Sequence, residues 1–244
     1  MLHRATNYPY DRPDQSYVYD DGEITAFDVW PGEIAAGRTP VLAFGSNAAP
    51  EQLRRKFGDL AGTVIPVIQA DLTNFDVVYS AHLTAYGAVP ATLAPSPGTT
   101  LHTWITWLDE GQLERMHRSE MGTSWGAQVN YAYGALSSIQ LRQSHDLGVL
   151  EQVGVYLSNH GALRLDDRPV AFDIVPATGR EFSSKSMGEI LDQVRAQLET
   201  DLSVEQFIDR AVNDTEARAA WTEALRHAAH LLIIPGFRTD DFGG

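Results

Sequence analysis

The feature that most constrains the fold of this chain is a short apolar run that stops abruptly at a glycine. Residues 41–44, Val-Leu-Ala-Phe, have the composition of a buried strand, and Gly-Ser-Asn follows at residues 45–47. Residues 50–57 then carry a helix signature, with a proline near the start, an acidic residue in the first turn and basic residues later. The predicted order is therefore strand, tight turn and helix.

A turn of this kind can hold an anion. Main-chain N–H groups that lack partners in the turn and are aimed at one point form a site for a carboxylate or phosphate. Gly45 has no Cβ, so the main chain can approach a ligand closely there. The alternative is that Gly-Ser-Asn only connects two elements, because all three residue types are common in turns.

Composition and charge exclude several classes of function. The chain of 244 residues contains no cysteine, which excludes disulfides, cysteine nucleophiles and thiolate zinc sites. Its net charge of -14 at pH 7 argues against nonspecific binding to nucleic acid or to an anionic membrane surface. The sequence contains no run of about 18 apolar residues, so we expect no membrane-spanning helix. The first nine residues lack an apolar signal core, so we expect a cytoplasmic protein.

Three parts follow one another along the chain. Residues 1–39 include a stretch rich in Tyr, Asp and Pro, which we interpret as an N-terminal arm that packs on the domain, remains mobile or closes over its pocket. Residues 40–180 are rich in strands, and residues 181–244 in helices, which predicts an α+β protein with a C-terminal helical cap. The apolar, strand-like runs cover residues 63–68, 75–79, 89–93, 101–108, 131–136, 153–157 and 168–175, with a turn at residues 95–98.

Local capping signals mark three C-terminal helices. Two pairs match capping boxes, namely Ser186 with Glu189 and Ser203 with Gln206. Asp214 is the predicted cap of a third helix, whose apolar stripe extends to residue 232 and which residues 235–236, Pro-Gly, are expected to stop.

Glu120 is predicted to face the apolar side of a helix that Asp109 caps. Leu113, Met116 and Glu120 stand at relative positions zero, three and seven, which fall within a stripe of about 60°. A carboxylate aimed inward is costly unless it meets hydrogen-bond donors or becomes neutral, and such a carboxyl group suits proton transfer. The alternative is that the helix ends before Glu120 and leaves it in a solvated turn beside Gly122.

Taken together, these segments resemble the γ-glutamylcyclotransferase-like family. Phe44-Gly45-Ser46-Asn47, the Pro-Ser-Pro-Gly of residues 95–98, a tryptophan-bearing strand and Glu120 on the next helix occur in the family's order within residues 40–135. The resemblance implies a mixed β-sheet or barrel of that type, here with a C-terminal helical extension. The chain departs from the family pattern at Phe44, where tyrosine is usual, and at Met121, which separates Glu120 from a glycine.

The resemblance also implies a reaction. In it the α-amine of a γ-glutamyl group attacks its own γ-carbonyl, which forms 5-oxoproline and releases an amine or amino acid. Glu120 would be the general acid and base, and Phe44, Gly45, Ser46 and Asn47 would bind the substrate, with no metal or organic cofactor. The rival hypothesis is a catalytically lapsed module on the same fold that binds a small amino-acid-like ligand. The sequence leaves the oligomeric state open.

Two other chemistries have weaker support. His227 and His230 are three residues apart on a predicted helix, but no His-Glu-X-X-His motif occurs, so we expect no metal site. Ser119 lies close to His117 and Glu120, but no Gly-X-Ser-X-Gly elbow accompanies it, so we expect no nucleophilic serine.

Overall fold

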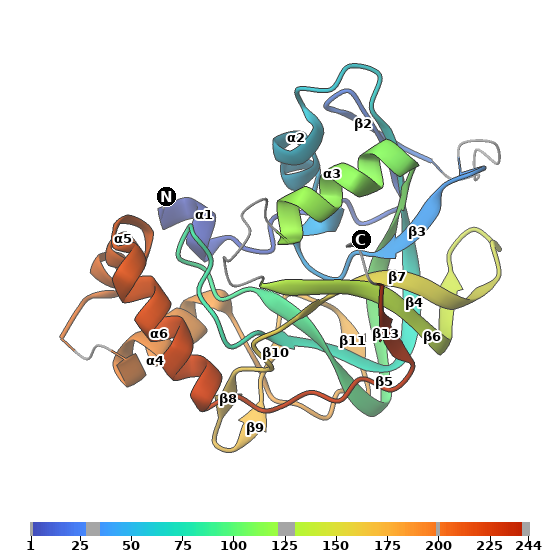
Figure 1. Ribbon diagram of the computed structural model, residues 1–244. Helices are drawn as coiled ribbons and strands as arrows, with labels where there is room; N and C mark the ends of the chain where they lie inside the picture. Colours follow the sequence, from blue (N-terminus) through green and yellow to red (C-terminus); the bar gives the residue numbers. More distant parts are fainter. Residues whose placement is uncertain (1, 28–34, 122–129, 199–200, 241–244) are drawn as a thin grey trace.

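The structure is a computed structural model that describes residues 2–27, 35–121, 130–198 and 201–240 of the chain (Figure 1). Its helices are α1 (Leu2–Thr6), the 3-10 helix η1 (Ser46–Ala48), α2 (Pro50–Phe57), α3 (Glu110–Met121), α4 (Met187–Leu198), α5 (Val204–Asn213) and α6 (Thr215–His227). Its strands are β1 (Tyr17–Asp20), β2 (Glu23–Ala26), β3 (Thr39–Leu42), β4 (Val64–Tyr79), β5 (Ala91–Leu108), β6 (Tyr131–Gln143), β7 (Val149–Ser158), β8 (Arg164–Leu165), β9 (Arg168–Pro169), β10 (Ala171–Phe172), β11 (Ala177–Thr178), β12 (Ser184–Lys185) and β13 (Phe237–Thr239).

Five strands close into a barrel. The ring runs β4–β5–β3–β7–β6 and returns to β4, with parallel pairing between β3 and β7 and antiparallel pairing elsewhere. Closure gives each of these strands two neighbours, which removes the exposed edges that an open sheet presents. The predicted α+β class, a mixed sheet or barrel with a C-terminal helical extension, is confirmed.

The core consists of two main apolar clusters. One lines the barrel and continues toward the C-terminal helices, and includes Leu42, Leu72 and Ile105. The other joins α2 and α3 to the barrel through Leu53, Phe57, Met116 and Trp104. The second cluster anchors both helices beside the end of β3, which is where the predicted site lies.

The turn expected at residues 95–98 does not end a strand. The separate strand-like runs merge into the two long strands β4 and β5, and the ladder between them skips residues 96–99, which bulge opposite Asn74. Asn74 adopts a φ of 66°, and its side-chain oxygen accepts a hydrogen bond from the Gly98 N–H at 3.0 Å. The turn residues are absorbed as a bulge because the chain pairs with β4 on both sides of them.

The three C-terminal helices begin where their caps predict. Both capping boxes form, and the Asp214 side chain accepts a hydrogen bond from the Ala217 N–H at 2.9 Å. The predicted end of the third helix is wrong, because α6 ends at His227. His230 instead exchanges main-chain hydrogen bonds with Ala162, which places residues 228–232 outside any helix and leaves Leu231 80% exposed.

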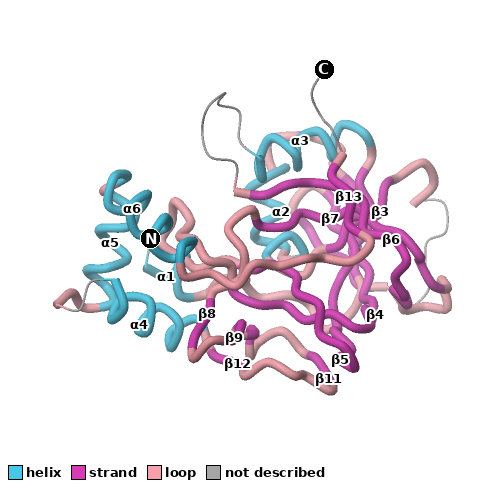
Figure 2. The backbone as a smooth tube through the Cα atoms, turned by 60° about the horizontal axis from the view of Figure 1, so that its bottom comes forward, coloured by secondary structure: helices cyan, strands magenta, loops and turns pink. Residues whose placement is uncertain are grey.

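The described part of the predicted N-terminal arm is packed against the rest of the molecule. Strand β1 pairs with β4, and the Tyr17 hydroxyl donates to the Ala48 carbonyl oxygen at 2.6 Å. Helix α1 lies at the end of the molecule that holds α4, α5 and α6 (Figure 2). The division at residues 39 and 180 into arm, domain and helical region stays a prediction.

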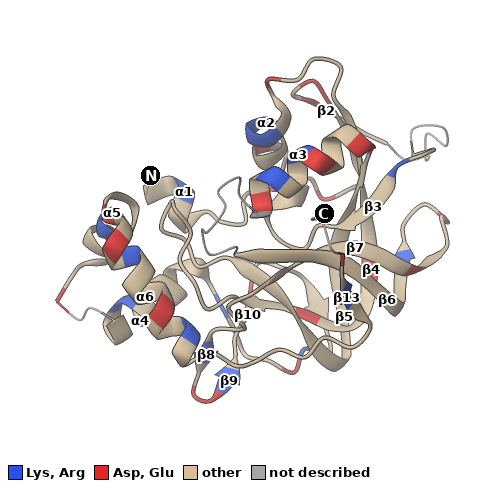
Figure 3. Ribbon diagram, viewed as in Figure 1, with Lys and Arg blue, Asp and Glu red and all other residues tan. Residues whose placement is uncertain are grey.

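Charged residues of both signs are interspersed over the helices and loops (Figure 3). In the described part of the chain, no helix is both long and apolar enough to cross a membrane.

Candidate active site

The turn after β3 has the strand-to-helix geometry expected from the sequence. The chain leaves β3, passes through Gly45 into η1, and enters α2 at Pro50. The main-chain N–H groups of Gly45, Ser46 and Asn47 donate to no acceptor among the described residues. These three groups are therefore donors available to a ligand.

Helix α3 carries Glu120 into the interior, and its last residue is Met121. The alternative that the helix ends before Glu120 is therefore wrong; Gly122 lies outside the described residues. Asp109 caps the helix by accepting a hydrogen bond from the Gln112 N–H at 2.8 Å. The Glu120 side chain is 17% exposed, so most of its surface is removed from water.

The carboxylate of Glu120 meets two donors on one oxygen. Its Oε1 accepts a hydrogen bond from Asn47 Nδ2 at 3.0 Å, and it forms an ion pair with the buried Lys56 ammonium. No described residue donates to Oε2, and Asn47 Oδ1 is buried without a described donor. Lys56 compensates the burial of the carboxylate, while Oε2 and Asn47 Oδ1 are left as acceptors for a ligand.

Two hollows meet at Glu120. The smaller has a volume of about 40 Å³ and is lined by all five predicted site residues, Phe44, Gly45, Ser46, Asn47 and Glu120. The larger, of about 210 Å³, shares Tyr8, Ser46, Glu120 and Tyr131 with it. The smaller hollow holds on the order of one water molecule, so a ligand of amino-acid size needs the larger hollow as well.

Three tyrosines that the sequence did not single out as site residues line the smaller hollow. The Tyr8 hydroxyl accepts a hydrogen bond from the Ala91 N–H, the Tyr131 hydroxyl donates to the Ala91 carbonyl oxygen, and Tyr156 is bonded to His117 Nδ1. Burial raises the pKa of all three phenols above their usual value, so they are neutral at physiological pH. Tyr8 belongs to the Tyr-rich N-terminal arm, for which closure over the pocket was one of the predicted roles. Tyr131 and Tyr156 were predicted only as strand residues.

The larger hollow also contains a cation. The Arg4 guanidinium stacks over the Tyr86 ring, 4.2 Å from its centroid, and Arg4 Nε donates to the Tyr10 hydroxyl. No described carboxylate pairs with Arg4. Together with Lys56, it gives this hollow two positive groups against the one negative charge of Glu120.

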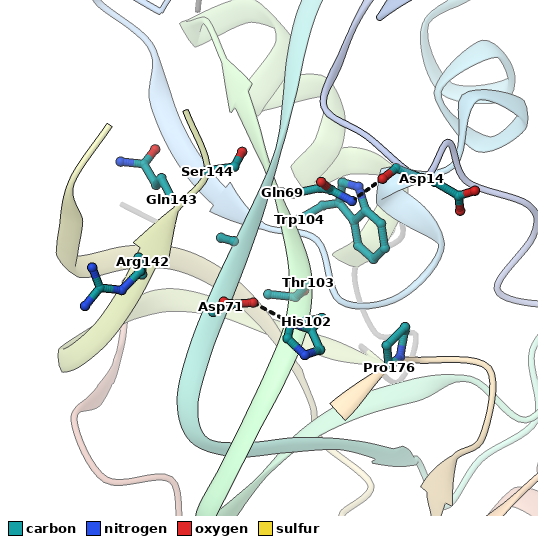
Figure 4. Close-up of a pocket in the computed structure, with 11 residues that line it drawn as sticks. Asp14, Gln69, Asp71, His102, Thr103, Trp104, Arg142, Gln143, Ser144 and Pro176 are labelled. Atoms are coloured by element: carbon teal, nitrogen blue, oxygen red, sulfur yellow. Dashed lines mark hydrogen bonds and ion pairs between the residues drawn. The ribbon is translucent and has the colours of Figure 1, made fainter. Parts of the chain in front are cut away.

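A separate hollow of about 500 Å³ lies over strands β4, β5 and β6 (Figure 4). It contains a hydrogen-bonded pair, Asp71 Oδ1 and His102 Nδ1 at 2.5 Å, whose side chains are nearly half exposed. None of the predicted site residues lines it. The hollows at Glu120 are the better candidate site despite their smaller volume, because they contain a buried ion pair and unpaired main-chain donors.

The residues singled out for other chemistries do not converge. His227 pairs with Glu223 at 2.9 Å at the end of α6, and His230 lies beyond that helix, so the two do not share a helix face. The Ser119 hydroxyl donates to the Met116 carbonyl oxygen at 2.8 Å. Within the described ranges, no group of three His, Cys, Asp or Glu residues is placed to hold a metal ion.

No family model and no curated protein matches this sequence. Several solved structures resemble it. A gamma-glutamyl cyclotransferase matches with 13% identity over 85% of this chain and 92% of its own, at a TM-score of 0.38. An uncharacterized Homo sapiens protein matches with 12% identity over the same shares, at 0.39. The solution structure of an Arabidopsis thaliana protein matches with 16% identity over 50% of this chain and 70% of its own, at 0.37.

Proposed function

We propose that this protein is a γ-glutamylcyclotransferase-like enzyme that releases 5-oxoproline and an amine or amino acid from a small γ-glutamyl compound. The observation that carries the proposal is the meeting of Glu120 with the Gly45–Asn47 turn at one cavity, where Asn47 is hydrogen-bonded to Glu120. Because the two segments are far apart in the sequence, their meeting depends on the packing of α3 beside the end of β3.

In this reaction Glu120 moves one proton. The α-amine nitrogen attacks the γ-carbonyl carbon, the lactam C–N bond forms, and the C–N bond to the leaving amine breaks. Oε2 of Glu120, which has no described donor, takes the proton from the attacking amine and returns it to the leaving nitrogen. Lys56 and Asn47 hold Oε1 and so fix the orientation of the carboxylate throughout.

The turn supplies binding and orientation. The N–H groups of Gly45, Ser46 and Asn47 would bind the α-carboxylate of the γ-glutamyl group, and Phe44 would form part of the wall. Asn47 Oδ1 would accept a hydrogen bond from the attacking amine. Holding the glutamyl chain folded for ring closure brings the amine and the carbonyl carbon together before reaction, which lowers the entropic part of the barrier.

A binding or regulatory module on the same fold is the second candidate. Phe44, which stands where the family usually has tyrosine, favours it, because Phe44 has no hydroxyl to hydrogen-bond a substrate or Glu120. Both candidates share a small amino-acid-like ligand, and we propose a cytoplasmic location for either.

Incubation with a panel of γ-glutamyl peptides and γ-glutamyl amines, followed by mass spectrometry, tests the enzyme. The wild-type protein should release 5-oxoproline from at least one compound. Glu120→Gln should lower kcat by on the order of 10²–10⁴ while the compound still binds, because the amide cannot take up the proton. Glu114→Gln, on the exposed side of the same helix, should retain wild-type kcat.

One outcome contradicts the enzyme, and another contradicts the role of Glu120 alone. Absence of 5-oxoproline across the panel, together with a rise in Tm on adding one of the compounds, would favour the binding module. Product release that Glu120→Gln leaves unchanged would show that another group carries the proton.

A further inference from the structure

A chain of hydrogen bonds links the end of β7 to a buried imidazole. The main-chain N–H of His160 donates to Ser158 Oγ at 3.0 Å. Ser158 Oγ lies 2.6 Å from Ser80 Oγ, which lies 2.8 Å from His82 Nδ1. Ser80 and His82 are buried, with exposed fractions of 0% and 1%. The chain thus joins two segments that are far apart in the sequence.

One direction of donation along this chain leads toward His82. Ser158 Oγ accepts a hydrogen bond from the main-chain N–H of His160 and can donate its own proton to Ser80 Oγ, its other described partner. In that arrangement Ser80 donates its proton to His82 Nδ1. An imidazole that accepts at Nδ1 carries its proton on Nε2. Burial lowers the pKa of His82 well below its usual value, with the neighbouring His160 as a second cause, so the ring is neutral at physiological pH.

His82 lines the larger hollow together with Glu120. Its Nε2 has no hydrogen-bond partner among the residues that the structure describes. The ring is held in place by stacking on His160, with centroids 4.5 Å apart, and by an edge contact with Tyr131 at 5.6 Å. With its proton on Nε2, His82 adds a neutral N–H donor to the lining of the hollow that contains the candidate catalytic carboxylate.

We propose that His82 is a catalytic residue that donates its Nε2–H to the γ-carbonyl oxygen of the substrate, and that Ser80 is a positioning residue that keeps the proton on Nε2. This inference rests on the proposed cyclotransferase function. The carbonyl oxygen gains negative charge when the α-amine attacks, and a preorganised neutral donor stabilises that charge in the transition state. The proton stays on His82 throughout, so the proton balance between amine, Glu120 and leaving group is unchanged.

Substitutions of His82 distinguish a role as hydrogen-bond donor to the substrate from a role in packing alone. His82→Leu removes the donor and should lower kcat by on the order of 10²–10³ with little change in KM. His82→Gln keeps an N–H group and should restore part of that loss, which a packing role alone does not predict. Ser80→Ala should lower kcat less than His82→Leu does. His102→Leu, in the separate hollow over β4 and β5, should leave kcat unchanged.

The imidazole ¹⁵N chemical shifts of His82 give a readout that does not depend on turnover. The proposal predicts a neutral ring protonated at Nε2 in the wild-type protein and a mixture of tautomers in Ser80→Ala. A wild-type ring protonated at Nδ1 would overturn it, as would wild-type kcat in His82→Leu. If Leu at position 82 prevents folding, Ser80→Ala carries the same test, and an unchanged kcat and tautomer there would overturn the proposal.

Failure of the proposed function has a different signature. It appears as absence of 5-oxoproline from the wild-type protein with every γ-glutamyl compound, and that result also removes the role of His82 in catalysis. Failure of the His82 assignment alone appears in a wild-type protein that does turn over, as His82→Leu or Ser80→Ala with unchanged kcat.

Discussion

At the scale of single residues, Gly45 matters for a reason that the sequence did not reveal. Its φ of -99° is negative, so glycine is not needed there for a left-handed main-chain conformation. A Cβ at this position would lie 2.8 Å from the Tyr8 hydroxyl oxygen. The missing side chain therefore allows Tyr8 of the N-terminal arm to reach the turn, where Tyr8 lines both hollows.

We expect Gly45→Ala to displace Tyr8, lowering the free energy of unfolding by about 1–3 kcal/mol and weakening ligand binding. Tyr8→Phe removes the hydroxyl that the new Cβ would contact. The double variant should therefore lose less free energy of unfolding than the sum of the losses in the single variants. Urea unfolding of all three variants measures this. Gly188→Ala in α4, where nothing lies within 4 Å of the new Cβ, should not destabilise the protein. Purely additive losses at positions 8 and 45 would contradict the steric explanation.

The placement of Glu120 was predictable because a helix repeats every 3.6 residues, so spacing from Met116 alone decides its face. Its ion-pair partner was not predictable. Lys56 occupies the last turn of α2, where a basic residue is ordinary, and only the packing of α2 against α3 makes it a buried countercharge. His82 and the site tyrosines were missed for the same reason, since neither spacing nor a motif distinguishes them.

At the scale of elements, interactions between residues a few positions apart were predictable from local patterns, whereas features that depend on distant partners were not predictable from those patterns. The capping boxes of α4 and α5 involve residues three positions apart, so the sequence contains the whole interaction. The bulge at residues 96–99 depends on β4, and the end of α6 depends on hydrogen bonds between His230 and Ala162. Closure of the barrel likewise needs the parallel contact of Val41 with Gly154, which no local pattern predicts.

At the scale of the whole molecule, three buried histidines should make stability depend on pH. Burial lowers the pKa of His82, His117 and His160 below their usual value. In the unfolded chain these rings take up protons near pH 6.5, while in the folded protein they do so only at lower pH. Their contribution to stability is therefore fully present above about pH 7 and is lost as the pH falls below that value.

We expect the free energy of unfolding to fall between pH 7 and pH 5.5, with a limiting slope of about 1.4 kcal/mol per pH unit for each of these histidines. Urea unfolding at several pH values in this range measures the slope. His82→Gln should make it shallower by up to the contribution of one group. A free energy of unfolding that is constant from pH 7 to pH 5.5 would contradict buried, neutral histidines.

The most direct test of the central claim is a crystal structure of the Glu120→Gln protein with γ-glutamylglycine. The account predicts that the α-carboxylate of the ligand contacts the N–H groups of Gly45, Ser46 and Asn47, with its α-amine beside the side chain at position 120. Density for the ligand in the hollow of Asp71 and His102, with the space beside Asn47 unchanged, would contradict it.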